Sequence, residues 1–229
     1  MSIKSRLLIA AATLTVIGGV PAVVTLSASA ATPACGESCY SIFTPEFGTL
    51  ADPQFVEAVL DGEAKVGQPL ILRPASSSDP SADLIPDLRR VSDFFAVGMV
   101  SAEVDRHYGK LFAAQIQYAP SGVPTGLCVG LAKPALSNQA LTLQPCSVPG
   151  TTVWIAASVH SPDTAQDGYF PLVNASTRNF SRPIAMDYPH RAHPTDEPAT
   201  PIRVRHLKTT GPGPVPALQL WGLRRGVLE

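Results

Sequence analysis

The stretch that decides the fold is Gly126-Leu127-Cys128-Val129, followed by Asn138-Gln139-Ala140-Leu141-Thr142-Leu143-Gln144-Pro145-Cys146 and then by Trp154. Apolar and polar residues alternate through both segments, which is the period of a half-buried strand. The two cysteines stand 18 positions apart, and the tryptophan follows eight positions after the second. The stretch therefore predicts two short strands joined by a polar turn, with a large aromatic anchor behind them.

The same pattern returns twice elsewhere in the chain. A weaker copy runs through residues 55–74, and a third runs through residues 182–207 and ends on Gln219-Leu220-Trp221. A single strand–turn–strand unit has too little apolar surface to form a core alone, so repeated units are expected to pack together. The repeats indicate one domain built from three related units.

The rest of the chain favours short strands over helices. Its 23 prolines and 17 glycines are evenly scattered and leave little room for long helices. Candidate strands with alternating apolar positions are residues 55–60, 69–72, 112–118, 127–131, 140–143, 153–157, 170–173, 184–186, 202–207 and 218–223. So many short strands at this spacing are typical of a β-sandwich or a β-barrel.

Two segments interrupt this series. In residues 91–111, Phe94, Val97, Val100, Val104 and Tyr108 stand three or four apart, as in a helix, although Phe95, Val97 and Met99 also alternate. We interpret this segment as an insertion between two groups of strands and leave open whether it is helical. Residues 189–201 hold four prolines and several charged side chains, which predicts an exposed loop.

These residues resemble the repeat of the ricin B-type β-trefoil lectins. In that family a cysteine on an early strand pairs with one about eighteen residues later, and Gln-x-Trp follows; Cys128, Cys146 and Trp154 fit the spacing. The intact Gln219-Leu220-Trp221 lies near the C-terminus. The resemblance covers about residues 42–229 and implies an all-β β-trefoil with pseudo-threefold repeats, one insertion, and tryptophans that anchor the core. The whole chain also resembles small secreted bacterial proteins, a likeness that names no activity.

The resemblance is incomplete at the family's sugar sites. These sites usually carry an aspartate two residues after the first cysteine, where the carboxylate accepts hydrogen bonds from adjacent sugar hydroxyls. That position holds Gly130 here, and the matching places are Ala58 or its neighbour Glu57 in the first copy and Ala185, with Asp187 two residues further on, in the third. The fold is thus expected to survive while the standard sugar pockets do not.

The third repeat keeps the best set of sugar-binding residue types. Asp187 offers a carboxylate, Tyr188 a ring face for the apolar side of a pyranose, and Gln219 an amide. The resemblance therefore implies a non-catalytic, lectin-like domain whose partner is an extracellular glycan. The alternative is a secreted structural or protein-interaction domain that uses the trefoil only as a scaffold.

The beginning of the chain has the three parts of a secretory signal peptide. These are the basic Lys4 and Arg6, the apolar residues 7–26, and Ala28-Ser29-Ala30. We expect cleavage after Ala30, which leaves one secreted, monomeric domain of residues 31–229 that is free of the membrane. An uncleaved anchor is the alternative, because about 20 apolar residues suffice to cross a bilayer.

All four cysteines lie after this segment, and an even number in an exported chain favours disulfides. Three pairings are possible. We prefer Cys35 with Cys39 and Cys128 with Cys146, because each pair closes a short segment bounded by turn residues. A zinc site is the competing interpretation, but the chain has no second closely spaced cysteine pair, and no histidine pair, at the spacing of a zinc finger.

Charge and motifs argue against several other functions. The signal segment takes two of the 17 basic and none of the 18 acidic side chains, so the mature net charge is −3 with histidine neutral. Nucleic-acid binding would need a concentrated positive face. No Gly-x-Ser-x-Gly is present to place a nucleophilic serine, and no acidic pair has distinctive spacing. We expect no enzyme, cofactor or metal.

Overall fold

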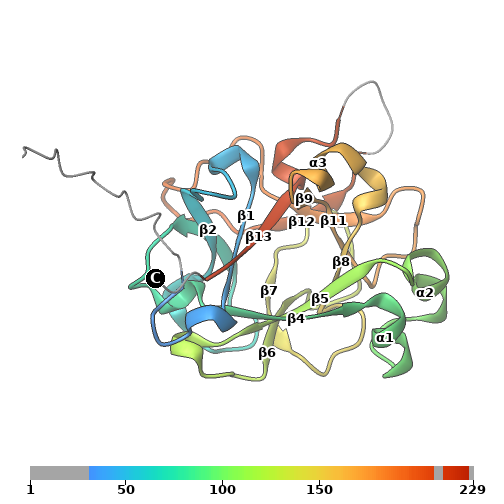
Figure 1. Ribbon diagram of the computed structural model, residues 1–229, viewed down its shortest axis with the longest axis horizontal. Coiled ribbons are helices and arrows are strands. Elements are labelled where there is room, and N and C mark those ends of the chain that lie inside the picture. Colours follow the sequence, from blue (N-terminus) through green and yellow to red (C-terminus); the bar gives the residue numbers. More distant parts are fainter. Residues whose placement is uncertain (1–30, 209–213, 227–229) are drawn as a thin grey trace, which may run out of the picture.

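The computed structural model describes residues 31–208 and 214–226, so the predicted signal peptide lies outside the described residues. Six strand positions form a closed antiparallel barrel, in which β9 and β10 are two pieces of one strand around Pro171 (Figure 1). Its members, in order around the barrel, are β1 (Tyr40–Phe43), β4 (Leu84–Arg90), β5 (Phe112–Tyr118), β8 (Val153–Ala156), β10 (Leu172–Asn174) with β9 (Tyr169–Phe170), and β13 (Trp221–Arg225).

Three further hairpins lie around this barrel and correspond to the three predicted copies (Figure 1). They are β2 (Phe55–Val59) with β3 (Leu70–Pro74), β6 (Leu127–Gly130) with β7 (Thr142–Pro145), and β11 (Ile184–Asp187) with β12 (Arg203–His206). Each unit therefore contributes two barrel strands and one hairpin. The predicted barrel architecture and the three copies are confirmed.

A ring of backbone hydrogen bonds marks the pseudo-threefold axis. The amide of Leu70 donates to the carbonyl of Leu141 (3.1 Å), Leu141 donates to Ile202 (2.9 Å), and Ile202 donates back to Leu70 (2.8 Å). All three side chains are buried in the main core. The three residues therefore occupy equivalent positions in the three units. The strand registers then show which other residues of the units are equivalent.

The registers settle which residues correspond to Gly130. Gly130 pairs with Thr142, the residue after Leu141 of the ring. In the same way, Ala58 pairs with the residue after Leu70, and Asp187 pairs with the residue after Ile202. Of the two candidates that the sequence left in the first copy, Ala58 is the equivalent residue and Glu57 precedes it. In the third copy the prediction of Ala185 was wrong, because the register makes Asp187 the equivalent residue.

Both tryptophans are core anchors, as the resemblance implied. Trp154 and Trp221 are fully buried, and their indole N–H groups donate to the carbonyls of Val129 (2.8 Å) and Met186 (3.2 Å). The pairings of β1, β5 and β9 with β4, β8 and β13 place Leu84 at the equivalent position of the first unit. The first unit therefore lacks the aromatic anchor of the other two.

The insertion after β4 is helical. It contains α1 (Val91–Ala96) and α2 (Ala102–Tyr108), and the Ser101 hydroxyl caps α2 by accepting from the amide of Val104 (3.2 Å). Val91 and Phe94 of α1 and Val104 and Tyr108 of α2 pack into a second cluster on the outside of the barrel, while Phe95 remains exposed. The helical spacing, and not the alternation, was therefore the correct signal here.

The remaining helices are short. They are α3 (Pro162–Gln166) and the 3₁₀ turns Gly36–Ser38, Pro45–Phe47, Leu60–Gly62, Pro80–Ala82, Pro120–Gly122, Ser158–His160 and Ala217–Gln219. Within residues 31–208 and 214–226, none of the helices has the length and apolar character needed to span a bilayer.

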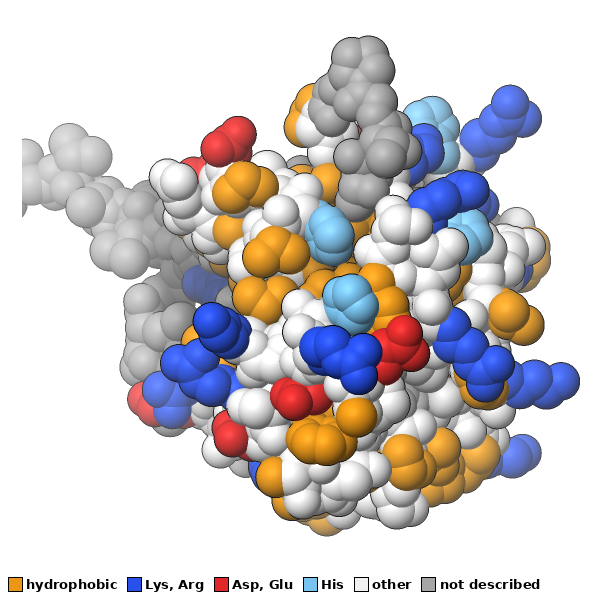
Figure 2. Space-filling model, turned by 90° about the vertical axis from the view of Figure 1, so that its right-hand side faces the viewer, with side chains coloured by type: hydrophobic (Ala, Val, Ile, Leu, Met, Phe, Trp, Pro, Cys, Tyr) orange, Lys and Arg blue, Asp and Glu red, His pale blue; other side chains and the backbone are white. Residues whose placement is uncertain are grey.

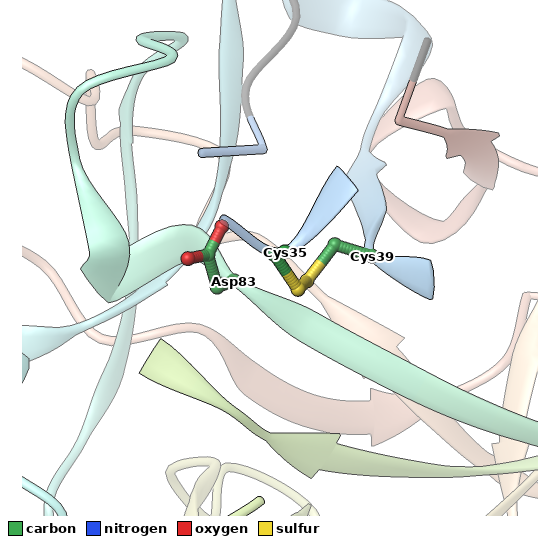
Figure 3. A group of neighbouring side chains, drawn as sticks. All are labelled: Cys35, Cys39 and Asp83. Carbon is green, nitrogen blue, oxygen red and sulfur yellow. A yellow bond between two sulfur atoms is a disulfide. The ribbon is translucent and has the colours of Figure 1, made fainter. Parts of the chain in front are cut away.

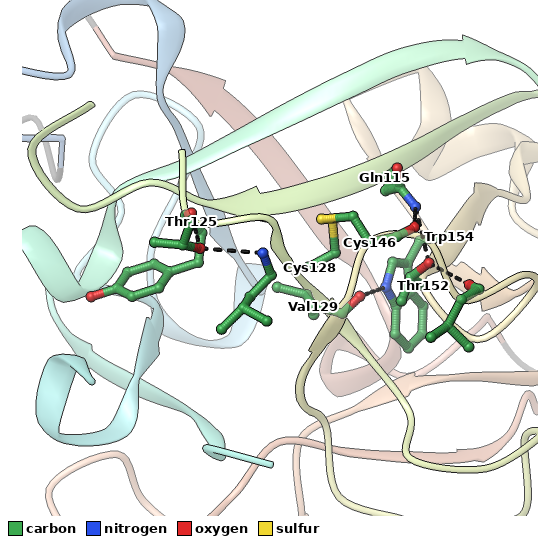
Figure 4. The surroundings of a disulfide bond; sticks show 10 residues. Gln115, Thr125, Cys128, Val129, Cys146, Thr152 and Trp154 are labelled. Atoms are coloured by element: carbon green, nitrogen blue, oxygen red, sulfur yellow. Dashed lines mark hydrogen bonds between the residues drawn. A yellow bond between two sulfur atoms is a disulfide. The ribbon is translucent and has the colours of Figure 1, made fainter. Parts of the chain in front are cut away.

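Both preferred disulfides are present. Cys128 and Cys146 join the β6–β7 hairpin, with Trp154 directly beneath it (Figure 4). The side-chain nitrogen of Gln115 donates to the carbonyl of Cys146 (2.6 Å) and to the hydroxyl of Thr152 (3.0 Å), which fixes the hairpin to the barrel.

The second disulfide, Cys35–Cys39, lies beside the buried Asp83 (Figure 3). The Asp83 carboxylate accepts from the amide and hydroxyl of Thr32 (2.8 and 2.7 Å) and from the amide of Ser121 (2.8 Å). The two sulfurs are bonded to each other, and the carboxylate accepts hydrogen bonds from Thr32 and Ser121. The group therefore anchors the N-terminal segment to the barrel. It is not a set of free thiolate ligands.

Candidate functional site

The structure places the three predicted sugar-binding residues together, but it buries them. Tyr188 is 1% exposed, and its ring makes an edge-to-face contact with Phe47 at 5.6 Å between centroids. Burial raises the pKa of Tyr188 to about 12. The expectation that this ring presents a face to a pyranose is contradicted, because the ring packs in the core beneath the first unit.

Gln219 is also committed to internal bonds. It is 2% exposed; its amide nitrogen donates to the carbonyl of His206 (3.2 Å), and its amide oxygen accepts from the amide of Lys208 (3.1 Å). The side chain therefore ties β12 to the final strand. An outward-facing amide is not what the structure shows.

Asp187 is the member of this set nearest to solvent. It is 7% exposed and forms an ion pair with the half-exposed Arg205 at 3.3 Å. Burial raises the pKa of Asp187, and Arg205 and Gln219 oppose that rise. A sugar hydroxyl would have to compete with Arg205 for this carboxylate, so Asp187 as a ligand contact stays a prediction.

A groove between the second and third units offers more accessible surface. Its first half is a cavity of about 400 Å³ between the turn of the β6–β7 hairpin and the segment that leads into β11. Pro134, Ala135, Leu136 and Ile184 provide an apolar lining. The polar lining residues of this half are Lys133, Ser137, Thr177, Arg178, Asn179 and His206.

The second half continues toward the insertion. It is a cavity of about 520 Å³ that shares Pro134, Thr177 and Arg178 with the first half and reaches the turn between α1 and α2. Ser101 and Ser176 add hydroxyl groups, and Glu103 is its one acidic lining residue. We call the two halves together the basic groove, lined by residues 98–101, 103, 133–137, 149–150, 175–179, 184 and 206.

Hydrogen bonds hold the first wall of the basic groove in place. The side chain of Gln139 accepts from the amide of Leu136 (3.0 Å) and donates to the carbonyl of Lys133 (3.2 Å). The amide of Ala135 donates to the hydroxyl of Ser176 (2.8 Å), which links this turn to the opposite wall. The turn is therefore fixed at both ends.

The opposite wall is built on the buried Asn174 at the end of β10. Its amide nitrogen donates to the carbonyl of Thr151 (3.0 Å), and its oxygen accepts from the amide of Ser176 (3.1 Å). Asn179 repeats the second bond by accepting from the amide of Ser181 (3.1 Å). Such preorganised walls reduce the ordering cost of binding a ligand.

Cations outnumber anions in the lining of the groove, which holds Lys133 and Arg178 against the single acidic Glu103. Lys133 and Arg178 are exposed, and neither takes part in an ion pair among the described residues. Figure 2 shows the face that carries α1 and α2, where Lys and Arg side chains project along the right-hand side with hydrophobic side chains between them. The full chain has a net charge of −1, whereas the lining of this groove carries a small excess of cations.

Sequence reasoning did not find the basic groove. Lys133 and Arg178 belong to no motif and lie 45 positions apart, in different units. The local signal in the sequence is a pair of Asn-x-Ser segments at Asn174 and Asn179, because asparagine and serine favour turns, and these turns shape one wall.

Comparison with solved structures supports the fold. The designed threefold-symmetric protein ThreeFoil matches with a TM-score of 0.50 and 13% identity over 82% of this chain and 98% of its own. The ricin B-like lectin of Macrolepiota procera, solved in complex with lactose, matches with a TM-score of 0.46 and 17% identity over 83% and 96%. No protein-family model and no curated protein sequence matches the chain.

The barrel, the three hairpins and the threefold hydrogen-bond ring establish a β-trefoil, and the disulfide-linked hairpin and the tryptophan anchors lie where the resemblance to the ricin B repeat implied them. At these identities the likenesses concern the fold alone. The ligand must therefore be inferred from the surface of this chain.

Proposed function

We propose that this protein is a secreted, non-catalytic carbohydrate-binding domain that holds an acidic glycan in the basic groove. The observation that carries the proposal is the combination of an elongated, preorganised groove with the free cations Lys133 and Arg178 on its edge. Two disulfides are in keeping with an oxidising extracellular compartment.

The chemistry of the groove suits a sugar that carries carboxylate or sulfate groups. Arginine and lysine form strong charge-assisted hydrogen bonds with such anions. The hydroxyl of the exposed Ser137 and the side-chain nitrogen of Asn179 suit ring hydroxyls, and the apolar lining suits the C–H face of a pyranose. A neutral sugar would leave both cations without a partner.

The test is calorimetric titration of residues 31–229 with a uronic-acid oligosaccharide and with a neutral one of equal length. We expect binding of the acidic oligosaccharide that weakens with salt, because exposed ionic contacts are screened. Arg178→Ala should lower its affinity about tenfold or more, since a hydrogen bond to a charged group contributes roughly 1.5–3 kcal/mol. Arg191→Ala, an exposed arginine outside the groove, is the matched control.

The variant Asp187→Ala separates this site from the one that the sequence suggested. Unchanged affinity in Asp187→Ala, together with loss in Arg178→Ala, supports the basic groove. The reverse pattern would place the glycan at Asp187 and refute the groove. Absence of binding to both oligosaccharides would refute the proposed function.

A further inference from the structure

The open end of the barrel, opposite the hydrogen-bond ring, contains a second and independent cavity. It has a volume of about 530 Å³, and every barrel strand contributes to its lining. Tyr40, Phe170 and Leu223 line it from the neighbouring strands β1, β9 and β13, Ala114 and Ala156 line it from the neighbouring strands β5 and β8, and the fully buried Trp154 is part of its lining. Mouths of β-barrels and apolar cavities of this size are common places for small ligands.

Broken threefold symmetry creates this cavity. Tyr40, Ala114 and Phe170 are equivalent residues, because each pairs with the anchor position of its own unit. Two units therefore fill the barrel mouth with an aromatic ring, and the second unit has only a methyl group there. Two residues after the anchor, Ala156 likewise stands where the third unit has Leu223. The space is a gap of missing side chains on one side of the axis.

The rim of the cavity combines apolar and cationic groups. Phe112 and Leu88 are 57% and 48% exposed, which is unusual for large apolar side chains that touch a cavity. The guanidinium of Arg90 lies 5.3 Å from the centre of the Phe112 ring and donates to the carbonyl of Lys110 (2.9 Å). Lys110 itself lines the cavity.

No carboxylate balances these cations at the cavity. Lys110 is the one charged residue of the lining, and among the described residues neither Lys110 nor Arg90 forms an ion pair. The nearby Asp87 is paired with Arg89, and the carboxylate of Asp93 accepts from the backbone amide of Arg90 (3.2 Å). The rim therefore presents positive charge above an apolar interior.

We propose that the barrel mouth binds a single-chain anionic amphiphile, such as a free fatty acid. The hydrocarbon chain enters the cavity toward Trp154, where burial of each methylene is favourable, and the carboxylate stays at the rim near Lys110 and Arg90. An apolar ligand without an anion would leave the rim cations unpaired, and a sugar would bury hydroxyls against apolar walls at a cost. This site does not depend on the proposed glycan function.

The test uses tryptophan fluorescence of residues 31–229 with fatty acids below their micelle concentration. A dodecanoate brominated near its methyl end should quench the emission, because the fully buried Trp154 lines the cavity that the hydrocarbon chain would enter. Affinity should rise about fourfold for each methylene between octanoate and decanoate. Decanol and the methyl ester of decanoate should bind about tenfold more weakly than decanoate, because they lack the charge.

Two variants locate the ligand. Ala114→Phe installs the residue of the equivalent position in the third unit and should abolish quenching by filling the cavity. If that variant has a lowered urea midpoint, Ala156→Leu serves the same purpose with the residue found at Leu223. Lys110→Gln should lower the affinity for decanoate about tenfold and leave the affinity for decanol unchanged. Arg178→Ala in the basic groove should change neither affinity. Absence of quenching in the parent, or equal affinity in a folded cavity-filling variant, would overturn the proposal.

Discussion

Replacing Glu57 by methionine should stabilise the protein, and the gain should grow with pH. Glu57 lies in β2, is fully buried, and its carboxylate oxygens have no hydrogen-bond partner among the described residues. The equivalent residues of the other two units are Val129 and Met186, which belong to the main core. Glu57→Met therefore restores an apolar residue that the same backbone position already accepts.

The magnitude follows from the pKa of Glu57. Burial raises this pKa from its ordinary value of 4.5 to about 8. Below pH 4.5 the carboxyl of Glu57 is protonated in both the folded and the unfolded chain, so its pKa shift does not change the free energy of unfolding with pH. Between pH 4.5 and 8 the unfolded chain releases the proton while the folded chain keeps it, so stability falls as pH rises. Linkage over this window amounts to about 4 kcal/mol, and above pH 8 the loss levels off.

Urea unfolding at several pH values between 4.5 and 8.5, with both disulfides intact, measures this effect. The free energy of unfolding of Glu57→Met, minus that of the parent, should increase by about 4 kcal/mol across the range. Other titrating groups contribute to both proteins and cancel in the difference. The exposed Glu63→Gln variant controls for loss of one carboxylate. A difference that stays constant from pH 4.5 to 8.5 would show that Glu57 is ionised or solvated in the folded protein, and the reasoning would fail.

Three other predictions concern the framework. The Cys128→Ser, Cys146→Ser double variant should lose about 3 kcal/mol of unfolding free energy in urea, because an 18-residue span is no longer closed. Asp83→Ala should release the N-terminal segment by removing three hydrogen bonds, and limited proteolysis should then cut before β1 faster than in the parent. Gly130→Asp should lower the melting temperature and create no sugar site, because a Cβ there would lie 2.9 Å from the Thr151 carbonyl oxygen.

The three hairpins were predictable because their signals are local. In β6–β7 and β11–β12, alternating apolar residues flank polar turns, and a tryptophan follows each hairpin. The two helices of the insertion also have local spacing. Local periodicity therefore identified most elements and all three units.

Two barrel strands were missed because their stability depends on distant partners. The strand β4 contains Pro86 and the charged Asp87, Arg89 and Arg90, a composition that argues against a central strand. It is held by a seven-residue pairing with β5, which lies beyond the helical insertion in the chain. The strand β1 has four residues and pairs along its whole length with β13 at the other end of the chain.

The candidate site was predicted less well than the fold, for the same reason. Asp187 and Tyr188 begin a segment that looks exposed in the sequence, yet Tyr188 is covered by Phe47, which lies 141 positions earlier. Exposure is a property of the packed units, and no local pattern reports it. The basic groove likewise exists only because two units meet.

The backbone of this protein follows threefold symmetry more closely than its side chains do, and the departures carry information. The other two units have the apolar Val129 and Met186 at the position of Glu57, and the aromatic Tyr40 and Phe170 at the position of Ala114. The first departure places a buried acid in the core, which costs stability and serves no visible contact. The second removes packing from the barrel mouth, which also costs stability but opens a cavity beneath two cations. Both departures oppose folding, so better packing does not explain the presence of either residue. At Ala114 the compensating gain is access to a shaped apolar cavity with a charged rim, which is why the barrel mouth is the stronger candidate for a binding function than the buried acid.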